Sequence, residues 1–268
     1  MLRPDLPGGM MTMSGCSQGQ GGAGRVGDRH GAGGSWRDYR LAQWRFRAAR
    51  PTRVDPFPAR IVVDHPGASC PPERPLIVVR TLEWAEQALG AGQIGCPHPG
   101  CGGTLTRWGY GRRRRVRSLG ARTLDIRPRR ARCTRCAHTQ ILLPAAVQPR
   151  LADTTEVIGT ALAGKAAGHG HRRIADELQR SASTVRRWMR RAMRSAHLHW
   201  LWRRGSQALV RLEPDAFNQL PRPTSPLRDA LTVLAAAACA ARRRLGLTDP
   251  VWTLIGLHTQ GRLLAAPT

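Results

Sequence analysis

Four cysteines are spaced in a way that suits a metal ion. Cys96 and Cys101 enclose CPHPGC, and Cys133 and Cys136 enclose CTRC, so the pattern is C-x4-C, then 31 residues, then C-x2-C. Structural zinc takes four ligands in a tetrahedron, and two tight turns that each give two thiolates can supply them. The pattern therefore predicts a Zn²⁺ ion bound by these four cysteines. Four thiolates leave no open position for water, so the ion would be structural rather than catalytic.

The wide first pair leaves other ligand sets open. His98, inside CPHPGC, could replace one thiolate, and His138, in the triplet Cys-Ala-His, could replace one at the second pair. The thiols could also carry no metal. With zinc bound, the ion would fold a ribbon that is too small to be stable without it.

A second segment, HRRIADELQRSASTVRRWMRR at residues 171–191, has the pattern of a helix-turn-helix. Such a pair needs apolar residues at fixed places and a small residue where the helices approach. These positions are Ile174, Ala175, Leu178, Val185 and Trp188. Ser181 can cap the second helix, whereas Gln179 stands where glycine is common and would need a left-handed backbone. Two ordinary amphipathic core helices are the competing interpretation.

The second of these helices would expose a basic face. N-terminal side chains of a recognition helix contact base edges in the major groove, and later ones contact phosphates. The predicted DNA-binding residues are Arg172, Ser183, Thr184, Arg186, Arg187, Arg190 and Arg191. We expect Ser183, Arg186 and Arg187 to read bases, and Thr184 could serve either role. We expect Arg190 and Arg191 to contact phosphates of the DNA backbone.

Between residues 107 and 150 the sequence holds thirteen arginines and one acid, Asp125. Arginines without carboxylates to pair with suit phosphates. The run Arg112, Arg113, Arg114 and Arg115 is therefore predicted to make secondary phosphate contacts. A merely solvated face is the alternative.

The zinc ligands need a small β-structure to hold them. From Thr104 to Leu143, β-favouring segments (TLTRWGY, RRVRSL, TLDIRPRRARC, TQILLP) alternate with Gly, Pro and basic residues, which predicts a small antiparallel sheet. Pro128 should place its strand at an edge of this sheet. Upstream, Leu76–Val79 predicts a strand and Thr81–Leu89 a helix capped by Thr81.

Beyond Pro149 the apolar residues follow a helical period. Asp153 and Glu156 have the form of a capping box for a helix over 154–167, which would be the first of a trihelical domain. Its predicted apolar face consists of Val157, Ile158, Ala161 and Leu162.

Two further helices are predicted near the C-terminus. The first spans Leu227–Arg244, and a short one follows with Asp249 as its cap and Pro250 at its first position. Trp252 in that helix could pack into a core or form the face of a homodimer.

The fold class expected is α+β, with a small antiparallel zinc-ribbon sheet, a trihelical helix-turn-helix domain and C-terminal helices. Residues 1–74 have Gly-rich runs and no apolar periodicity, which predicts a disordered low-complexity tail with incidental thiols at Cys16 and Cys70. The other predicted parts are the zinc ribbon at 75–148, the helix-turn-helix at 150–200, a linker at 201–225 and a helical segment at 226–268.

The net charge of +26 comes almost entirely from arginine, because Lys165 is the only lysine. A charge this large favours nucleic acid as a partner, with an anionic membrane surface as the competing one. No segment approaches the ~18 apolar residues of a membrane span, and the start of the chain lacks the pattern of a secretory signal. We therefore expect a cytoplasmic, nucleoid-associated protein with reduced thiols.

The order of motifs from about residue 75 to 265 resembles a bacterial family of unknown function. CPHPGC, basic strands, CTRC and IADELQRSASTVRRWMRR follow one another here, and members of that family pair an N-terminal zinc ribbon with a helix-turn-helix. Similar modules stand at the front of insertion-sequence transposases. The resemblance implies binding of double-stranded DNA, with a link to mobile elements.

Catalysis is not expected. A transposase core needs three carboxylates on a ribonuclease-H-like sheet to hold two Mg²⁺ ions. The acids after the predicted helix-turn-helix are Glu213, Asp215, Asp229 and Asp249, without the βαβ alternation of such a core. The expected function is sequence-specific DNA binding, as a regulator or as a recognition fragment related to transposases. The alternative is a scaffold that binds RNA or DNA by charge alone.

Overall fold

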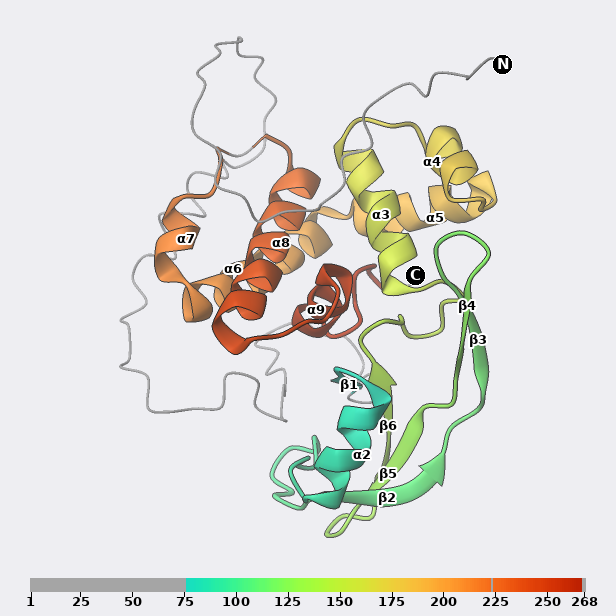
Figure 1. Cartoon of the computed structure of the whole chain (residues 1–268), viewed down its shortest axis with the longest axis vertical. Helices are drawn as coiled ribbons and strands as arrows, with labels where there is room; N and C mark the ends of the chain where they lie inside the picture. Colours follow the sequence, from blue (N-terminus) through green and yellow to red (C-terminus); the bar gives the residue numbers. More distant parts are fainter. Residues whose placement is uncertain (1–75, 223, 267–268) are drawn as a thin grey trace, which may run out of the picture. The chain divides into compact units, whose positions relative to one another are not determined.

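The computed structural model describes residues 76–222 and 224–266 and is mixed α+β, with a small sheet, a separate hairpin and several helices (Figure 1). The predicted tail at 1–74, with Cys16 and Cys70, lies outside the described residues. Within the described ranges, no helix combines the length and apolarity that crossing a bilayer requires.

The first elements are those that the sequence predicts. Strand β1 spans Ile77–Val79 and helix α2 spans Leu82–Gly90. Thr81 is the N-cap of α2, and its hydroxyl accepts a hydrogen bond from the backbone N–H of Trp84 at 3.1 Å. This bond satisfies one of the N–H groups that a helix start leaves without a partner.

The four-stranded sheet has the order β1-β6-β5-β2, with β2 at Leu105–Tyr110, β5 at Arg129–Cys133 and β6 at Thr139–Pro144. Strands β2, β5 and β6 pair antiparallel as predicted, whereas β1 joins the edge parallel to β6. Most buried apolar side chains of this sheet pack with α2 into one small core, which includes three of the four cysteines of the predicted zinc site. Leu143 of β6 belongs to a different buried cluster.

Strands β3 (Arg114–Arg117) and β4 (Thr123–Ile126) form a separate two-stranded hairpin. The prediction that Pro128 marks an edge strand is wrong. Pro128 lies in the connection between β4 and β5, and β5 is a central strand. A residue without an N–H is tolerated in this connection, where the Pro128 carbonyl still accepts from the N–H of Gly111 at 2.7 Å.

Three helices follow: α3 (Thr155–Ala166), α4 (His171–Glu177) and α5 (Ala182–Ala192). The predicted apolar face of α3 is buried, but the predicted capping box is not formed. Thr154 is the N-cap and accepts from the N–H of Val157 at 3.3 Å. Asp153 is not the cap because its carboxylate is occupied by two arginines.

The C-terminal part consists of α6 (Ser195–Leu212), α7 (Pro214–Asn218), α8 (Pro226–Leu245) and α9 (Val251–His258). The linker predicted at 201–225 is wrong for most of its length, because residues 201–212 belong to α6 and residues 214–218 form α7. That helix packs closely on α8 at Gly205, where an added Cβ would lie 2.9 Å from the backbone nitrogen of Leu234.

The long helix predicted near the C-terminus is confirmed as α8. For α9 the cap was mispredicted: Pro250 is the N-cap, and Asp249 instead pairs with Arg80 at 3.5 Å. Trp252 packs against Gly159 of α3, where an added Cβ would lie 2.3 Å from the indole ring. One side of the Trp252 ring is therefore covered by a helix of its own chain.

Candidate metal centre and nucleic-acid interface

The four predicted cysteines lie together. Their Sγ atoms are all within 4.8 Å of one another, and Cys96 to Cys136 and Cys101 to Cys133 are each 3.6 Å apart. A tetrahedral ion with zinc–sulfur bonds of about 2.3 Å would place its ligands roughly 3.8 Å apart. The cluster can therefore hold a metal ion, and its donor set and spacing suit zinc.

Two tight turns bring the cysteines together. In the first turn the N–H of Cys96 donates to the Gly103 carbonyl at 2.7 Å, and in the second the N–H of Cys133 donates to the His138 carbonyl at 2.9 Å. The first turn uses left-handed backbone at Gly100 and Gly102, with φ of 71° and 63°. Glycine adopts this conformation without steric cost, which explains the glycines beside CPHPGC.

Gly103 is required for a different reason. A Cβ at this position would lie 2.6 Å from the Sγ of Cys133 and 2.8 Å from the Cβ of Arg135. The backbone of the first turn thus approaches the sulfur of the second turn more closely than any side chain would allow.

Backbone N–H groups point at the sulfur atoms. His98 donates to the Sγ of Cys96 at 3.4 Å, while Arg135 and Cys136 donate to the Sγ of Cys133 at 3.3 and 3.4 Å. Burial opposes ionisation of Cys133, yet these N–H donors and the neighbouring thiols lower its pKa to about 6. Burial raises the pKa of Cys96 to about 12. Such N–H donors are the outer-shell contacts that stabilise thiolate ligands of a metal.

The two histidines proposed as rival ligands contact each other instead. The rings of His98 and His138 are exposed and lie 4.8 Å apart between centroids. Within the described residues, the group of side chains that could hold a metal contains the four cysteines and neither histidine. The geometry therefore favours the all-cysteine ligand set.

Helices α4 and α5 pack as a pair with the predicted residues between them. Four of the five predicted residues, Ile174, Ala175, Val185 and Trp188, are buried, and the fifth, Leu178, is half-buried. Gln179 has φ of 52°, so the turn does contain a left-handed residue that is not glycine. Such a backbone is uncommon outside glycine and needs support from its surroundings.

The start of α5 is fixed by local hydrogen bonds. The hydroxyl of Ser181, the N-cap, accepts from the N–H of Thr184 at 3.3 Å and donates to the Thr184 hydroxyl at 2.8 Å. Thr184 is therefore engaged with the cap. The hydroxyl of Ser183 also lies 3.3 Å from that of Ser181, but the Ser183 residue is exposed.

One side of α5 is buried and the opposite side is basic. The buried residues are Val185, Trp188, Met189 and Ala192, and the exposed ones are Ser183, Arg186, Arg187 and Arg190. Each set has the i, i+3, i+4, i+7 spacing of a single helix face. Among the described residues, no ion pair or hydrogen bond is found for the guanidinium groups of these three exposed arginines, nor is any acid present on α5. Arg172 of α4 is likewise exposed.

Arg191 differs from the other predicted DNA-binding residues. Its Nε donates to the Ala265 carbonyl at 2.6 Å, so this side chain anchors the C-terminal segment. Burial, together with nearby Arg194 and Arg187, lowers its pKa. Arg191 thus has a partner within the protein, unlike Arg186, Arg187 and Arg190.

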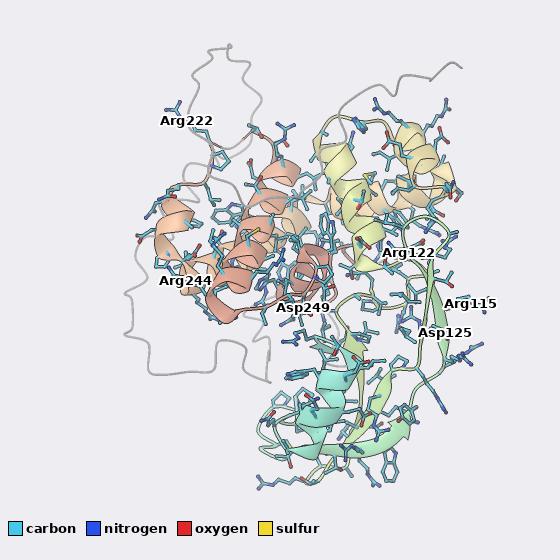
Figure 2. The ribbon with its side chains drawn as sticks, in the orientation of Figure 1. Arg115, Arg122, Asp125, Arg222, Arg244 and Asp249 are labelled. Carbon is cyan, nitrogen blue, oxygen red and sulfur yellow. The ribbon has the colours of Figure 1, made fainter. Side chains whose placement is uncertain are left out.

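In the run Arg112–Arg115, two arginines have partners within the protein and two are exposed. Arg113 donates to both carboxylate oxygens of Asp125, and Arg114 donates to the Leu151 carbonyl. Hydrogen bonding from Arg113 lowers the pKa of Asp125, and burial lowers that of Arg114. Arg112 and Arg115 are exposed at either side of this pair. Figure 2 labels Arg115, Arg122 and Asp125 along the same hairpin.

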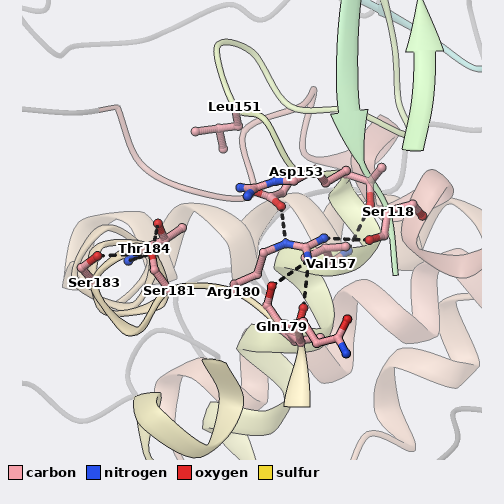
Figure 3. A network of polar contacts seen from close by, with 12 residues as sticks. Ser118, Leu151, Asp153, Val157, Gln179, Arg180, Ser181, Ser183 and Thr184 are labelled. Carbon is pink, nitrogen blue, oxygen red and sulfur yellow. Dashed lines mark hydrogen bonds and ion pairs between the residues drawn. The ribbon is translucent and has the colours of Figure 1, made fainter. Parts of the chain in front are cut away.

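A buried ion pair was not predicted from the sequence. Nε of Arg180 contacts the carboxylate of Asp153 at 2.6 Å, and their side chains are only 5% and 4% exposed (Figure 3). Twenty-seven residues separate the partners, so no spacing rule links them. The sequence suggested a capping role for Asp153 and no role for Arg180.

Comparison with known proteins gives a match, and it covers the segment that holds the cysteine cluster and the α4–α5 helix pair. A family model described as a domain of unknown function (DUF6431) matches residues 96–188. No curated protein and no solved structure matches the chain. The matched segment begins at the first cysteine of the cluster and ends at Trp188 on the buried face of α5, so over these residues the chain is similar to the DUF6431 family.

Proposed function

We propose that this protein is a sequence-specific DNA-binding protein that places α5 in the major groove of duplex DNA. The observation that carries the proposal is the exposed face of α5, where Arg186, Arg187 and Arg190 are aligned without protein partners among the described residues. Ser183 lies on the same face, and its hydroxyl is 3.3 Å from that of Ser181. Unpaired guanidinium groups in such a row suit guanine edges and phosphates.

The surrounding helices support this role. In the proposed arrangement, α3 is the supporting helix of a trihelical domain, and α4 and α5 are its helix-turn-helix. Buried Ala175 is the small residue at the approach of the two helices. Because a recognition helix contacts bases with its N-terminal part, Arg186 and Arg187 would read bases and Arg190 would bind phosphate.

Zinc would have a structural role next to this helix pair. Four thiolates would fill the coordination shell, so the ion would stabilise the sheet and its two turns without catalysing a reaction. In this proposal the sheet, α2 and the cysteine cluster form a zinc ribbon. The protein would act as a regulator or as a DNA-recognition protein related to transposases.

The test is selection of bound duplexes from a random pool, followed by affinity measurements across a salt series. A specific protein should enrich one motif and bind it at least about 10³-fold more tightly than random DNA. A two-fold symmetric motif would additionally indicate a dimer. Equal affinity for all sequences with a steep salt dependence would contradict the proposal. It would favour the charge-only scaffold, which the net charge of +26 supports.

Two neighbouring arginines provide a matched comparison. Arg187→Ala should relax the preference at one base pair by about 1 to 3 kcal/mol. Arg190→Ala should weaken binding to all duplexes alike and reduce the salt slope by about 1. A uniform loss with both variants would assign Arg187 to phosphate and remove the evidence for base reading.

A further inference from the structure

The β3–β4 hairpin is separate from the main sheet and needs an external support. Its strands have four residues each, and it closes through the N–H of Ser118 donating to the Arg122 carbonyl at 2.8 Å. An isolated two-stranded hairpin is marginally stable in water. The position of its tip must therefore come from contacts with other elements. Part of this support is apolar, because Val116 and Ile126 of the hairpin form a small buried cluster with Leu143 and Val147.

Arg180 adds polar contacts at the end of the hairpin from the turn between α4 and α5. One of its nitrogens, Nη2, donates to the Ser118 carbonyl at 2.7 Å, while Nε contacts Asp153 (Figure 3). Arg117 of the hairpin donates to the second oxygen of Asp153 at 2.7 Å. Two arginines and one carboxylate thus join the hairpin, the segment before α3 and the turn.

Backbone hydrogen bonds reinforce the same junction. The N–H of Arg117 donates to the Ala152 carbonyl at 2.8 Å, and the N–H of Thr154 donates to the Arg117 carbonyl at 2.9 Å. A buried and fully hydrogen-bonded ion pair has one favoured geometry, because any displacement leaves a desolvated charge without its partner. The end of the hairpin is therefore held in a defined position.

This position is next to the N-terminus of α5. Arg180 is followed directly by Ser181, the N-cap of α5. In the proposed function this end of α5 enters the major groove, so the hairpin is fixed beside the DNA backbone that borders the groove.

The exposed residues of the hairpin suit that location. Arg115 and Arg122 are exposed, and in the described residues neither guanidinium has an ion pair or hydrogen bond. The only acid in the hairpin, Asp125, faces Arg115 across the strands but is already bound by Arg113 on both oxygens. The hairpin therefore presents unneutralised positive charge.

We propose that the β3–β4 hairpin is a second DNA-contacting element, which binds phosphates beside the groove through Arg115 and Arg122. Arg180 is then a positioning residue that places the hairpin relative to α5. This inference rests on the proposed binding of duplex DNA. It adds a contact outside the helix pair, one that strengthens binding without reading bases.

The test uses the full chain with Arg115→Gln and Arg122→Gln combined, and the duplex selected above. Loss of two phosphate contacts should make the slope of log K against log salt shallower by about 1.8. The order of preference among sequences should not change. The matched control is Arg203→Gln with Arg211→Gln, which removes the same charge from exposed positions on α6.

Hydroxyl-radical footprinting gives a second measurement. The hairpin variant should lose backbone protection at the edge of the footprint and retain it over the motif, whereas the α6 control should retain both. If the hairpin variant shows the wild-type slope and footprint, the inference is wrong although the proposed function stands. If the wild-type chain prefers no duplex, the proposed function itself fails.

Discussion

At the scale of single residues, the cysteine cluster depends on positions that carry no ligand atom. The four cysteines provide the sulfur atoms, but Gly103 lets the two turns approach, since a Cβ there would lie 2.6 Å from the Sγ of Cys133. The spacing of the cysteines along the chain predicts neither the backbone N–H groups that donate to the sulfur atoms nor the close approach of the two turns. CPHPGC and CTRC were therefore enough to predict that these four cysteines lie together, whereas the surroundings of the sulfur atoms came from the structure.

Gly103→Ala should weaken metal binding while all four cysteines remain. The added methyl group would push the sulfur of Cys133 or the backbone of Arg135 out of place, and ligand sets tolerate only small changes in distance. Zinc content measured by emission spectroscopy after dialysis should fall below one ion per chain, and a chelator should remove the remainder faster.

The matched control for this variant is Gly170→Ala, because no atom lies within 4 Å of a Cβ at that position. Its zinc content should equal that of the wild type. A Gly103→Ala protein that keeps one tightly bound ion would show that the turns can separate without losing the site.

At the scale of elements, close helix contacts connect parts of the chain that the sequence presented as independent. Helix α3 meets α9 at Gly159, which lies directly under the ring of Trp252. The apolar face of α3 was predictable from its period, but the partner of that face was not. Periodicity shows which side of a helix is buried and does not identify what covers it.

Gly159→Ala should destabilise the fold by about 1 to 3 kcal/mol, as overpacking does in well-packed cores. The added methyl group cannot fit at 2.3 Å from the indole, so α3 and α9 would have to move apart. Urea unfolding followed by circular dichroism measures the change in free energy.

The double variant Gly159→Ala with Trp252→Leu tests whether this contact is the cause. If the methyl group and the ring compete for the same space, the two changes should be non-additive and the double variant should recover part of the loss. Strict additivity would mean that the methyl group disturbs α3 in another way.

At the scale of the whole molecule, the large excess of arginine is only partly available to a partner. Several arginines are used inside the protein, such as Arg180 with Asp153, Arg191 with the C-terminal segment and Arg114 with Leu151. The net charge therefore indicates a polyanionic partner without locating its binding surface. Contacts between remote segments decide which guanidinium groups remain free.

Stability should fall as the pH decreases from about 6.5 towards 4, partly because of one buried histidine. Burial and nearby Arg204 lower the pKa of His258 to about 4 from its ordinary value of 6.5. In this pH window the unfolded chain binds a proton at His258 that the folded chain does not. The linked loss at pH 5 relative to pH 7.5 is about 2 kcal/mol.

Unfolding in urea at the two pH values checks this prediction. His258→Gln removes the titrating group, so its stability should change less between pH 7.5 and pH 5 than that of the wild type, by about 2 kcal/mol. His171→Gln serves as the control because that side chain is only half-buried. An identical pH dependence in wild type and His258→Gln would contradict the low pKa of His258.

The sequence by itself determined the local features of this protein: the four cysteines, the burial pattern of α3 and α5, the Ser181 cap and the left-handed Gln179. Each of these follows from spacing or backbone preference over a few residues. The tertiary structure decided the rest. Asp153 forms an ion pair with Arg180 and is not a cap, and Pro128 lies in the connection between β4 and β5. Residues 201–212 are part of helix α6. These outcomes depend on which distant segment offers a partner, and such pairings are not encoded in any local period.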